Sequence, residues 1–172
     1  MDAVTRKICI IGDFAVGKTS TVARFVHSVF SEKYLTTVGV KIDTRTLATS
    51  SGTELKLVIW DIAGTDRFSA VEFSYLRGAS GYLVVADGTR LHTLDVAERL
   101  VEEARERYGE TPMVYLVNKS DLEDEWEVSE ERLAHLHDGD GALFITSAKT
   151  GANVDAALHA LADMVDPAGA QD

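Results

Sequence analysis

Residues 12–20 read GDFAVGKTS and directly follow the apolar run ICII. The pattern G-x-x-x-x-G-K-[ST] between a strand and a helix is typical of a phosphate-binding loop, because its glycines let successive backbone N–H groups converge on one anion. The helix that starts after the second glycine adds the positive end of its dipole. The residues that we expect around the phosphates are Asp13, Phe14, Ala15, Val16, Gly17, Lys18, Thr19 and Ser20.

Two side chains of this loop have specific expected roles. Lys18 is placed to reach the β- and γ-phosphates of a nucleotide, and Thr19 can offer its hydroxyl to Mg²⁺. The alternative is a glycine turn that precedes a helix by chance.

The composition of the whole chain excludes several classes of protein. The 172 residues carry a net charge of −11, which argues against a nucleic-acid binder that works by neutralising phosphates. One cysteine allows no internal disulfide, so we expect a cytoplasmic location. No apolar stretch can span a bilayer, and the last residues, DPAGAQD, hold no cysteine to lipidate, so we expect no membrane anchor in this chain.

Strand-like apolar runs alternate with helical patterns along the chain. The expected strands are 7–11, 38–49, 54–62, 81–87, 112–118 and 142–147. The expected helices are 18–30, 93–109, 129–137 and 153–165. The turn cluster SSGT predicts an antiparallel hairpin between the second and third strands, and Thr93 is a candidate N-cap. This order predicts an α/β fold with a mostly parallel sheet, helices on both faces and one antiparallel edge strand.

Ligands of such sheets bind beyond the carboxyl ends of the strands, so the residues after each apolar run are the candidates for function. The third run ends in DIAG, residues 61–64. Asp61 can hold Mg²⁺ through water, and Gly64 can present its N–H to a terminal phosphate. By itself this tetrapeptide is weak, because a strand-end aspartate often only caps a turn.

The next-to-last strand ends in NKSD, which contributes Asn118, Lys119 and Asp121. A carboxylate at Asp121 can accept two N–H bonds from guanine, whereas adenine would leave it unpaired, and such mismatches discriminate strongly. The stem of Lys119 can lie against the base. An ordinary polar loop is the alternative.

The last strand ends in SAK, which contributes Ser147, Ala148 and Lys149, and the Ala148 N–H could bind guanine O6. This tripeptide alone is uninformative. Four complementary parts of one site at four strand ends, in order, predict a guanine-nucleotide site.

These motifs together resemble a small GTPase of the Ras superfamily, most closely its Rab branch. The stretches YLTTVGVKI, WDIAGTDRF and YLRGASGYLVVADGT match in order and spacing as well. The resemblance runs from about residue 7 to residue 165 and implies one G domain over 1–172, a three-layer P-loop NTPase with six strands and about five helices. It also implies a monomeric GTP/GDP switch, whose exchange factors, activating proteins and effectors read loops around 30–42 and 61–77.

The resemblance assigns further site residues. Thr37 would bind Mg²⁺ and sense the γ-phosphate, Phe30 would cover the guanine, and Tyr34 would cover the phosphates. Helix-end packing of Phe30 and a solvent-facing ring at Tyr34 are the alternatives. The catalytic set would be Lys18, Thr37, Gly64 and Thr65. Contacts of Thr37 and Gly64 with the γ-phosphate would be lost on hydrolysis, which makes the switch.

Two residues of the site depart from the family pattern. Thr65 stands where the family usually has the glutamine that orients the attacking water, so we expect hydrolysis slower by ~10-fold or more. Phe14 stands where glycine or serine is usual, and its ring would crowd the space through which a partner's arginine enters. Alternatively, the ring folds away against the switch loops.

Other departures concern partners. Trp60 and Tyr75 match two of the three docking aromatics of Rab proteins, but Ile42 replaces the third, and hairpin packing is its alternative role. The absence of a cysteine-bearing tail indicates either a cut chain or an unlipidated, bacterial member. The acidic run EDEWEVSEE indicates a solvated loop that leads into a helix at Ser129, with a partner-binding Trp126 as the weaker interpretation.

Two other functions remain open. A non-hydrolysing scaffold that stays loaded with nucleotide would explain Thr65 and Phe14. A P-loop ATPase or kinase would share the first loop, but Asp121 argues against it.

Overall fold

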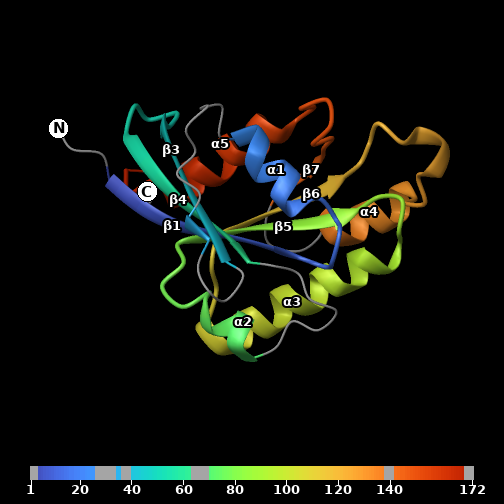
Figure 1. The fold of residues 1–172 in the computed structure, drawn as a ribbon, viewed down its shortest axis with the longest axis horizontal. Helices are drawn as coiled ribbons and strands as arrows, with labels where there is room; N and C mark the ends of the chain where they lie inside the picture. Colours follow the sequence, from blue (N-terminus) through green and yellow to red (C-terminus); the bar gives the residue numbers. More distant parts are fainter. Residues whose placement is uncertain (1–3, 26–33, 36–39, 63–69, 138–141, 169–172) are drawn as a thin grey trace.

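The computed structural model describes residues 4–25, 34–35, 40–62, 70–137 and 142–168. These residues build one sheet in the order β2-β3-β4-β1-β5-β6-β7 (Figure 1). The strands are β1 Val4–Gly12, β2 Tyr34–Leu35, β3 Val40–Ala48, β4 Glu54–Ile62, β5 Gly81–Asp87, β6 Met113–Asn118 and β7 Ala142–Ile145. The ladders from β4 to β7 are parallel, whereas β3 runs antiparallel to β4 and β2 to β3. The predicted fold class is confirmed, and the two-residue β2 extends the antiparallel edge.

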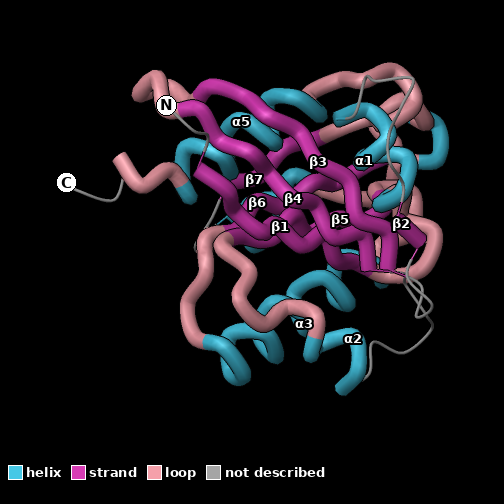
Figure 2. Tube along the Cα trace, turned by 60° about the vertical axis from the view of Figure 1, so that its left-hand side comes forward, coloured by secondary structure: helices cyan, strands magenta, loops and turns pink. Residues whose placement is uncertain are grey.

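Helices cover both faces of this sheet. They are α1 Lys18–Phe25, α2 Ala70–Ser74, α3 His92–Tyr108, α4 Glu130–His137 and α5 Val154–Val165, with a 3-10 turn, η1, at Glu123–Glu125. Figure 2 shows α1 and α5 on one side of the sheet and α2 and α3 on the other. Across the described part of the chain, no helix combines the length and the apolar character that crossing a membrane requires.

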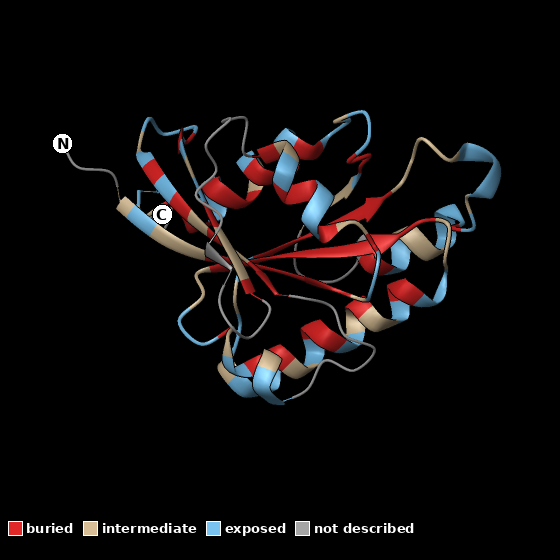
Figure 3. Cartoon of the chain, viewed as in Figure 1, coloured by how far each residue is buried: buried red, intermediate tan, exposed pale blue. Residues whose placement is uncertain are grey.

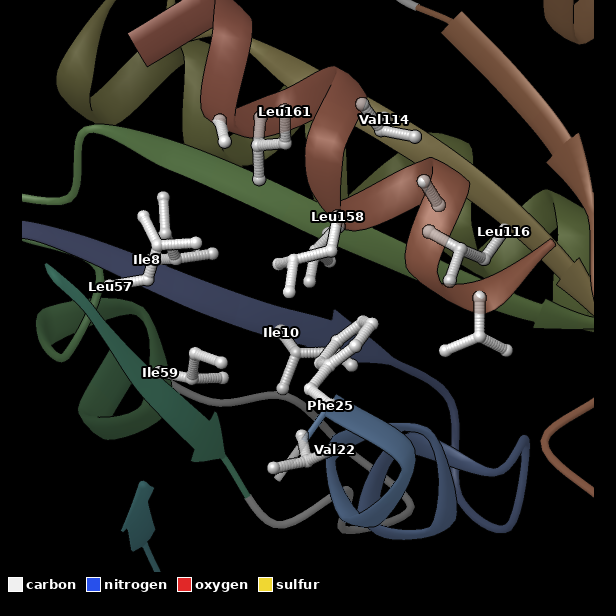
Figure 4. Packing of buried hydrophobic residues seen from close by; sticks show 14 of the residues in the cluster. Ile8, Ile10, Val22, Phe25, Leu57, Ile59, Val114, Leu116, Leu158 and Leu161 are labelled. Atoms are coloured by element: carbon white, nitrogen blue, oxygen red, sulfur yellow. The ribbon is translucent and has the colours of Figure 1, made fainter. Parts of the chain in front are cut away.

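Each face of the sheet carries its own hydrophobic core, because alternate side chains of a strand point to opposite faces. In β1, Ile8 and Ile10 belong to the core under α1 and α5, whereas Cys9 and Ile11 belong to the core under α3. Phe25 of α1 packs into the first core with these isoleucines (Figure 4). Buried residues therefore concentrate on the strands and on the helix faces that meet them (Figure 3). Two covered faces leave the carboxyl edge of the parallel strands as the place for polar loops.

The sequence predicts helix starts at Ser129 and Thr93, and the structure agrees with the first but not with the second. Ser129 caps α4, since its Oγ accepts a hydrogen bond from the N–H of Arg132 at 3.1 Å. The predicted N-cap at Thr93 is wrong, because α3 already begins at His92. The buried Thr93 hydroxyl instead donates to the carbonyl of Arg90 at 2.7 Å and accepts from the N–H of Asp87 at 2.8 Å. Thr93 thus fastens the loop between β5 and α3.

Candidate functional site

A cavity of about 510 Å³ lies between the loop after β1, the start of α1, the end of β4 and the residue that follows β6. The residues that line it are Phe14, Ala15, Gly17, Lys18, Thr19, Ser20, Asp61 and Lys119. All eight are predicted site residues. The parallel register of β1 with β4 and β5, and of β5 with β6, brings these distant loops to one edge.

The loop after β1 curls so tightly that Gly17 has no room for a side chain. Its φ is +102°, and a Cβ atom there would lie 2.2 Å from Nδ2 of Asn118. Gly17 therefore satisfies both the left-handed backbone and the close approach of a neighbouring loop. Ala15, with φ 58°, adopts a conformation that is unfavourable for a residue with a Cβ atom.

Lys18 opens α1 and is almost fully buried beside the cavity. Its Nζ donates to the carbonyls of Gly12 at 3.0 Å and of Asp13 at 2.9 Å. Burial lowers the pKa of Lys18, and the charges of Asp61 and Asp13 oppose that shift. The amine is thus held across the loop at the wall of the cavity.

Thr19 and Asp61 form the predicted metal pair. The Thr19 hydroxyl donates to Oδ2 of Asp61 at 2.7 Å. Oδ1 of the buried Asp61 has no hydrogen-bond partner among the residues that the structure describes. Mg²⁺ in phosphate sites is typically held by one or two protein oxygens together with the phosphates, so a hydroxyl beside an unpaired carboxylate oxygen fits this ion.

Asn118 connects three loops from the end of β6. Its Nδ2 donates to the carbonyl of Val16 at 3.0 Å, and its Oδ1 accepts from the N–H of Ala148 at 2.9 Å and from the hydroxyl of Thr146 at 3.2 Å. Asn118 is buried, so these bonds replace water at each group. It therefore holds the phosphate loop and the SAK loop at a set separation.

The predicted base-reading residues lie together beyond β6 and β7. Oδ1 of Asp121 accepts a hydrogen bond from the Ser147 hydroxyl at 2.7 Å. The Ala148 N–H, expected to bind guanine O6, already donates to Asn118, so the base would have to share or replace that bond. The carbonyls of Ala148 and Lys149 accept hydrogen bonds from Arg24 of α1.

The Phe14 side chain is 59% exposed at the cavity wall. Its ring is therefore not packed into either hydrophobic core. Its backbone is held, since its N–H donates to Oδ1 of Asp13 at 2.7 Å and its carbonyl accepts from Arg90 at 2.7 Å.

Several predictions fall outside the described residues. Phe30, Thr37, Gly64 and Thr65 all lie there, and for Tyr34 only the backbone of β2 is described. Their roles stay predictions.

The sequence interpretation missed three side chains that shape this site: Asp87, Arg90 and Arg24. Asp87 ends β5, so the strand-end rule that selected Asp61 and Asn118 could have selected it too. Arg90 and Arg24 act through backbone carbonyls of distant loops, and no local sequence pattern indicates such a contact.

Two predicted surface features have structural partners. Trp60 lies directly opposite Ile42 in the β3–β4 ladder and 6.4 Å from the ring of Tyr75, with Nζ of Lys7 3.8 Å above the Trp60 ring. Trp126 packs against the core under α3, and its ring lies on Gly88. Packing is thus a sufficient role for Trp126.

Comparison with known proteins shows which family the chain is similar to. The model of the Ras family matches residues 7–166. Ras-related protein Rab-25 of Bos taurus is 39% identical over 155 residues, which cover 89% of this chain and 72% of that protein. Ras-related protein RABA4b of Arabidopsis thaliana is 38% identical over 157 residues, with coverages of 90% and 70%. Ras-related protein Rab11A of Lotus japonicus is 39% identical over 154 residues, with coverages of 88% and 68%.

Proposed function

Because the chain belongs to the Ras family of small GTPases and resembles its Rab members, we propose that it is a GTP/GDP switch with slow hydrolysis of its own. The observation that carries this proposal is the cavity lined by the loop after β1, the start of α1, Asp61 at the end of β4 and Lys119 after β6. Its wall combines the backbone of the loop after β1, the buried amine of Lys18, the Thr19–Asp61 pair and Lys119. These groups suit a ligand that carries a polyphosphate and an attached base.

At the phosphate end, Lys18 and the N–H groups of the loop supply positive charge. Phosphoryl transfer needs mostly positioning and charge stabilisation, so a held amine beside the transferred group lowers the barrier without accepting a proton. Thr19 and Asp61 would hold Mg²⁺, which neutralises charge that develops on the phosphate oxygens. Thr37 would complete this set.

At the base end, Asp121 would accept the two N–H groups of guanine, in place of the Ser147 hydroxyl or beside it. The test is an affinity panel of GTP, GDP, xanthosine triphosphate and ATP on the wild type and Asp121→Asn. We expect the wild type to prefer guanine nucleotides and Asp121→Asn to shift its preference toward xanthosine triphosphate. The exposed Asp124→Asn serves as the control and should bind like the wild type. No binding of GTP or GDP, or an equal affinity for ATP, would end the proposal.

Slow hydrolysis rests on Thr65 and Phe14. Thr65 is too short to orient water as glutamine does, and the exposed ring of Phe14 stands at the cavity wall. In single-turnover assays we expect Thr65→Gln to speed hydrolysis by ~10-fold or more. A wild type already as fast as a glutamine-bearing relative, with no gain from Thr65→Gln or Phe14→Gly, would contradict this.

The same two residues also fit a second candidate function, a non-hydrolysing scaffold that stays bound to GTP. The nucleotide carried by purified protein separates the two. Bound GTP that converts to GDP over time supports the hydrolytic switch, whereas GTP that persists supports the scaffold.

Ras-family proteins generally act through effectors, exchange factors and activating proteins. We propose that the Ile42, Trp60 and Tyr75 side chains form part of the surface that such partners read. Ile42 and Trp60 face each other across the hairpin, and all three side chains are half-buried against the core under α3, so part of each apolar surface stays exposed.

A further inference from the structure

The carboxylate of Asp87, at the end of β5, is completely buried and shared by two cations. Its Oδ2 accepts from Nε of Arg90 at 2.9 Å and from Nζ of Lys119 at 2.7 Å. Burial by itself would raise the pKa of Asp87, but the hydrogen bonds from Lys119, Thr89 and Arg90 outweigh it and hold the pKa at about 2. Asp87 is therefore an anion at any physiological pH.

Arg90 extends this pair to the phosphate loop. Its Nη2 donates to the carbonyl of Phe14 at 2.7 Å while its Nε stays on Asp87. A planar guanidinium with two of its donors engaged has a set direction, unlike an ammonium group. A series of contacts thus links Lys119, through Asp87 and Arg90, to the backbone of Phe14.

The backbone at each end of this series of contacts has an unfavourable conformation. Lys119 has φ 72°, and Ala15, which shares the peptide group of the Phe14 carbonyl, has φ 58°. Non-glycine residues keep such conformations only where their surroundings impose them. In a trans peptide the C=O and N–H point in opposite directions, so a carbonyl fixed on Arg90 also fixes the direction of the Ala15 N–H. Ala15 lines the cavity.

We propose that Arg90 is a positioning residue of the phosphate loop, which it holds through the Phe14 carbonyl with Asp87 as its anchor. This inference rests on the proposed nucleotide site and adds a residue that its motifs do not contain. Loss of Arg90 leaves the Asp87–Lys119 pair in place, so the phosphate end should loosen while the base end keeps its geometry.

The test compares ligands of different length. Affinities for GDP, GMP and guanosine are measured by competition on the wild type, Arg90→Gln, Arg90→Lys and the control Arg105→Gln. Arg105 lies on α3, beyond the loop that holds Arg90, and forms an exposed pair with Glu110. Hydrogen bonds to charged donors are strong enough that we expect Arg90→Gln to lose about 10-fold or more in GDP affinity. We expect guanosine affinity to stay unchanged.

The remaining variants separate positioning from folding. Arg90→Lys keeps the charge but not the fork and should recover only part of the GDP affinity, and Arg105→Gln should match the wild type. Equal losses for GDP and guanosine, or no loss for either, would overturn the inference while leaving the nucleotide site standing. A wild type that binds no guanine nucleotide would instead remove the proposed function itself.

Discussion

The Thr19 hydroxyl lies 2.7 Å from Oδ2 of Asp61, yet Oδ1 of the same carboxylate meets no hydrogen-bond partner within the described residues. A buried, unpaired carboxylate oxygen is costly unless a ligand completes it. This relationship gives the metal pair a direct test.

Asp61→Asn should weaken the hold on Mg²⁺. A residue that binds a metal through its outer shell typically contributes about 10–100-fold to metal affinity. We therefore expect the Mg²⁺ concentration needed to halve the rate of GDP release to rise by about the same factor. The measurement is GDP release against free Mg²⁺, with the exposed Asp95→Asn as the control. An unchanged Mg²⁺ dependence in Asp61→Asn would exclude this carboxylate from the metal site.

Asn118→Ala should lower both stability and nucleotide affinity. The change leaves the Val16 carbonyl and the Ala148 N–H without their partner, and each buried unpaired group costs about 1–3 kcal/mol. We expect a lower free energy of unfolding in urea and faster GDP release. Asn118→Asp keeps an acceptor for Ala148 but cannot donate to Val16, so it should fail as well. Wild-type stability in both variants would show that this brace is dispensable.

Gly88→Ala should destabilise the loop after β5. A Cβ atom there would lie 2.0 Å from the ring of Trp126, and overpacking of this kind costs about 1–3 kcal/mol. The penalty should shrink when Trp126 is Leu in the same protein, because the smaller side chain vacates the contact. A double-mutant cycle of unfolding free energies measures this coupling, and a cost of Gly88→Ala that does not depend on residue 126 would contradict it.

The low pKa of Asp87 predicts how the free energy of unfolding depends on pH. Its pKa is about 2 in the folded protein against an ordinary 3.8, so the folded state binds this proton less readily than the unfolded chain. The resulting stabilisation is complete above about pH 4 and is lost as pH falls toward 2; the shift corresponds to about 2 kcal/mol.

Asp87→Asn removes this contribution. The difference in unfolding free energy between wild type and Asp87→Asn should therefore be constant near neutral pH and shrink below about pH 4. Urea unfolding of nucleotide-free samples at several pH values measures it, with Asp124→Asn as the control. A difference that grows on acidification would contradict the assigned ion pairs.

Local sequence patterns were enough for most of the architecture and for the outline of the site. The glycine spacing of residues 12–20 indicated a phosphate loop, because a tight turn before a helix has few backbone solutions. The continuous apolar run of residues 8–11 indicated a strand. Thr93 shows the limit of this reasoning, since its hydroxyl suits an N-cap but finds buried partners at Asp87 and Arg90.

The sequence by itself determined which residues stand at the strand ends and hence the kind of ligand that they suit. Only the tertiary structure decided how the loops hold one another. Arg90 meets the Phe14 carbonyl, and Asn118 meets Val16 and Ala148, because β1, β5, β6 and β7 lie side by side in that order. Such contacts join positions far apart in the chain through backbone groups that every residue carries, so no local pattern of side chains can report them.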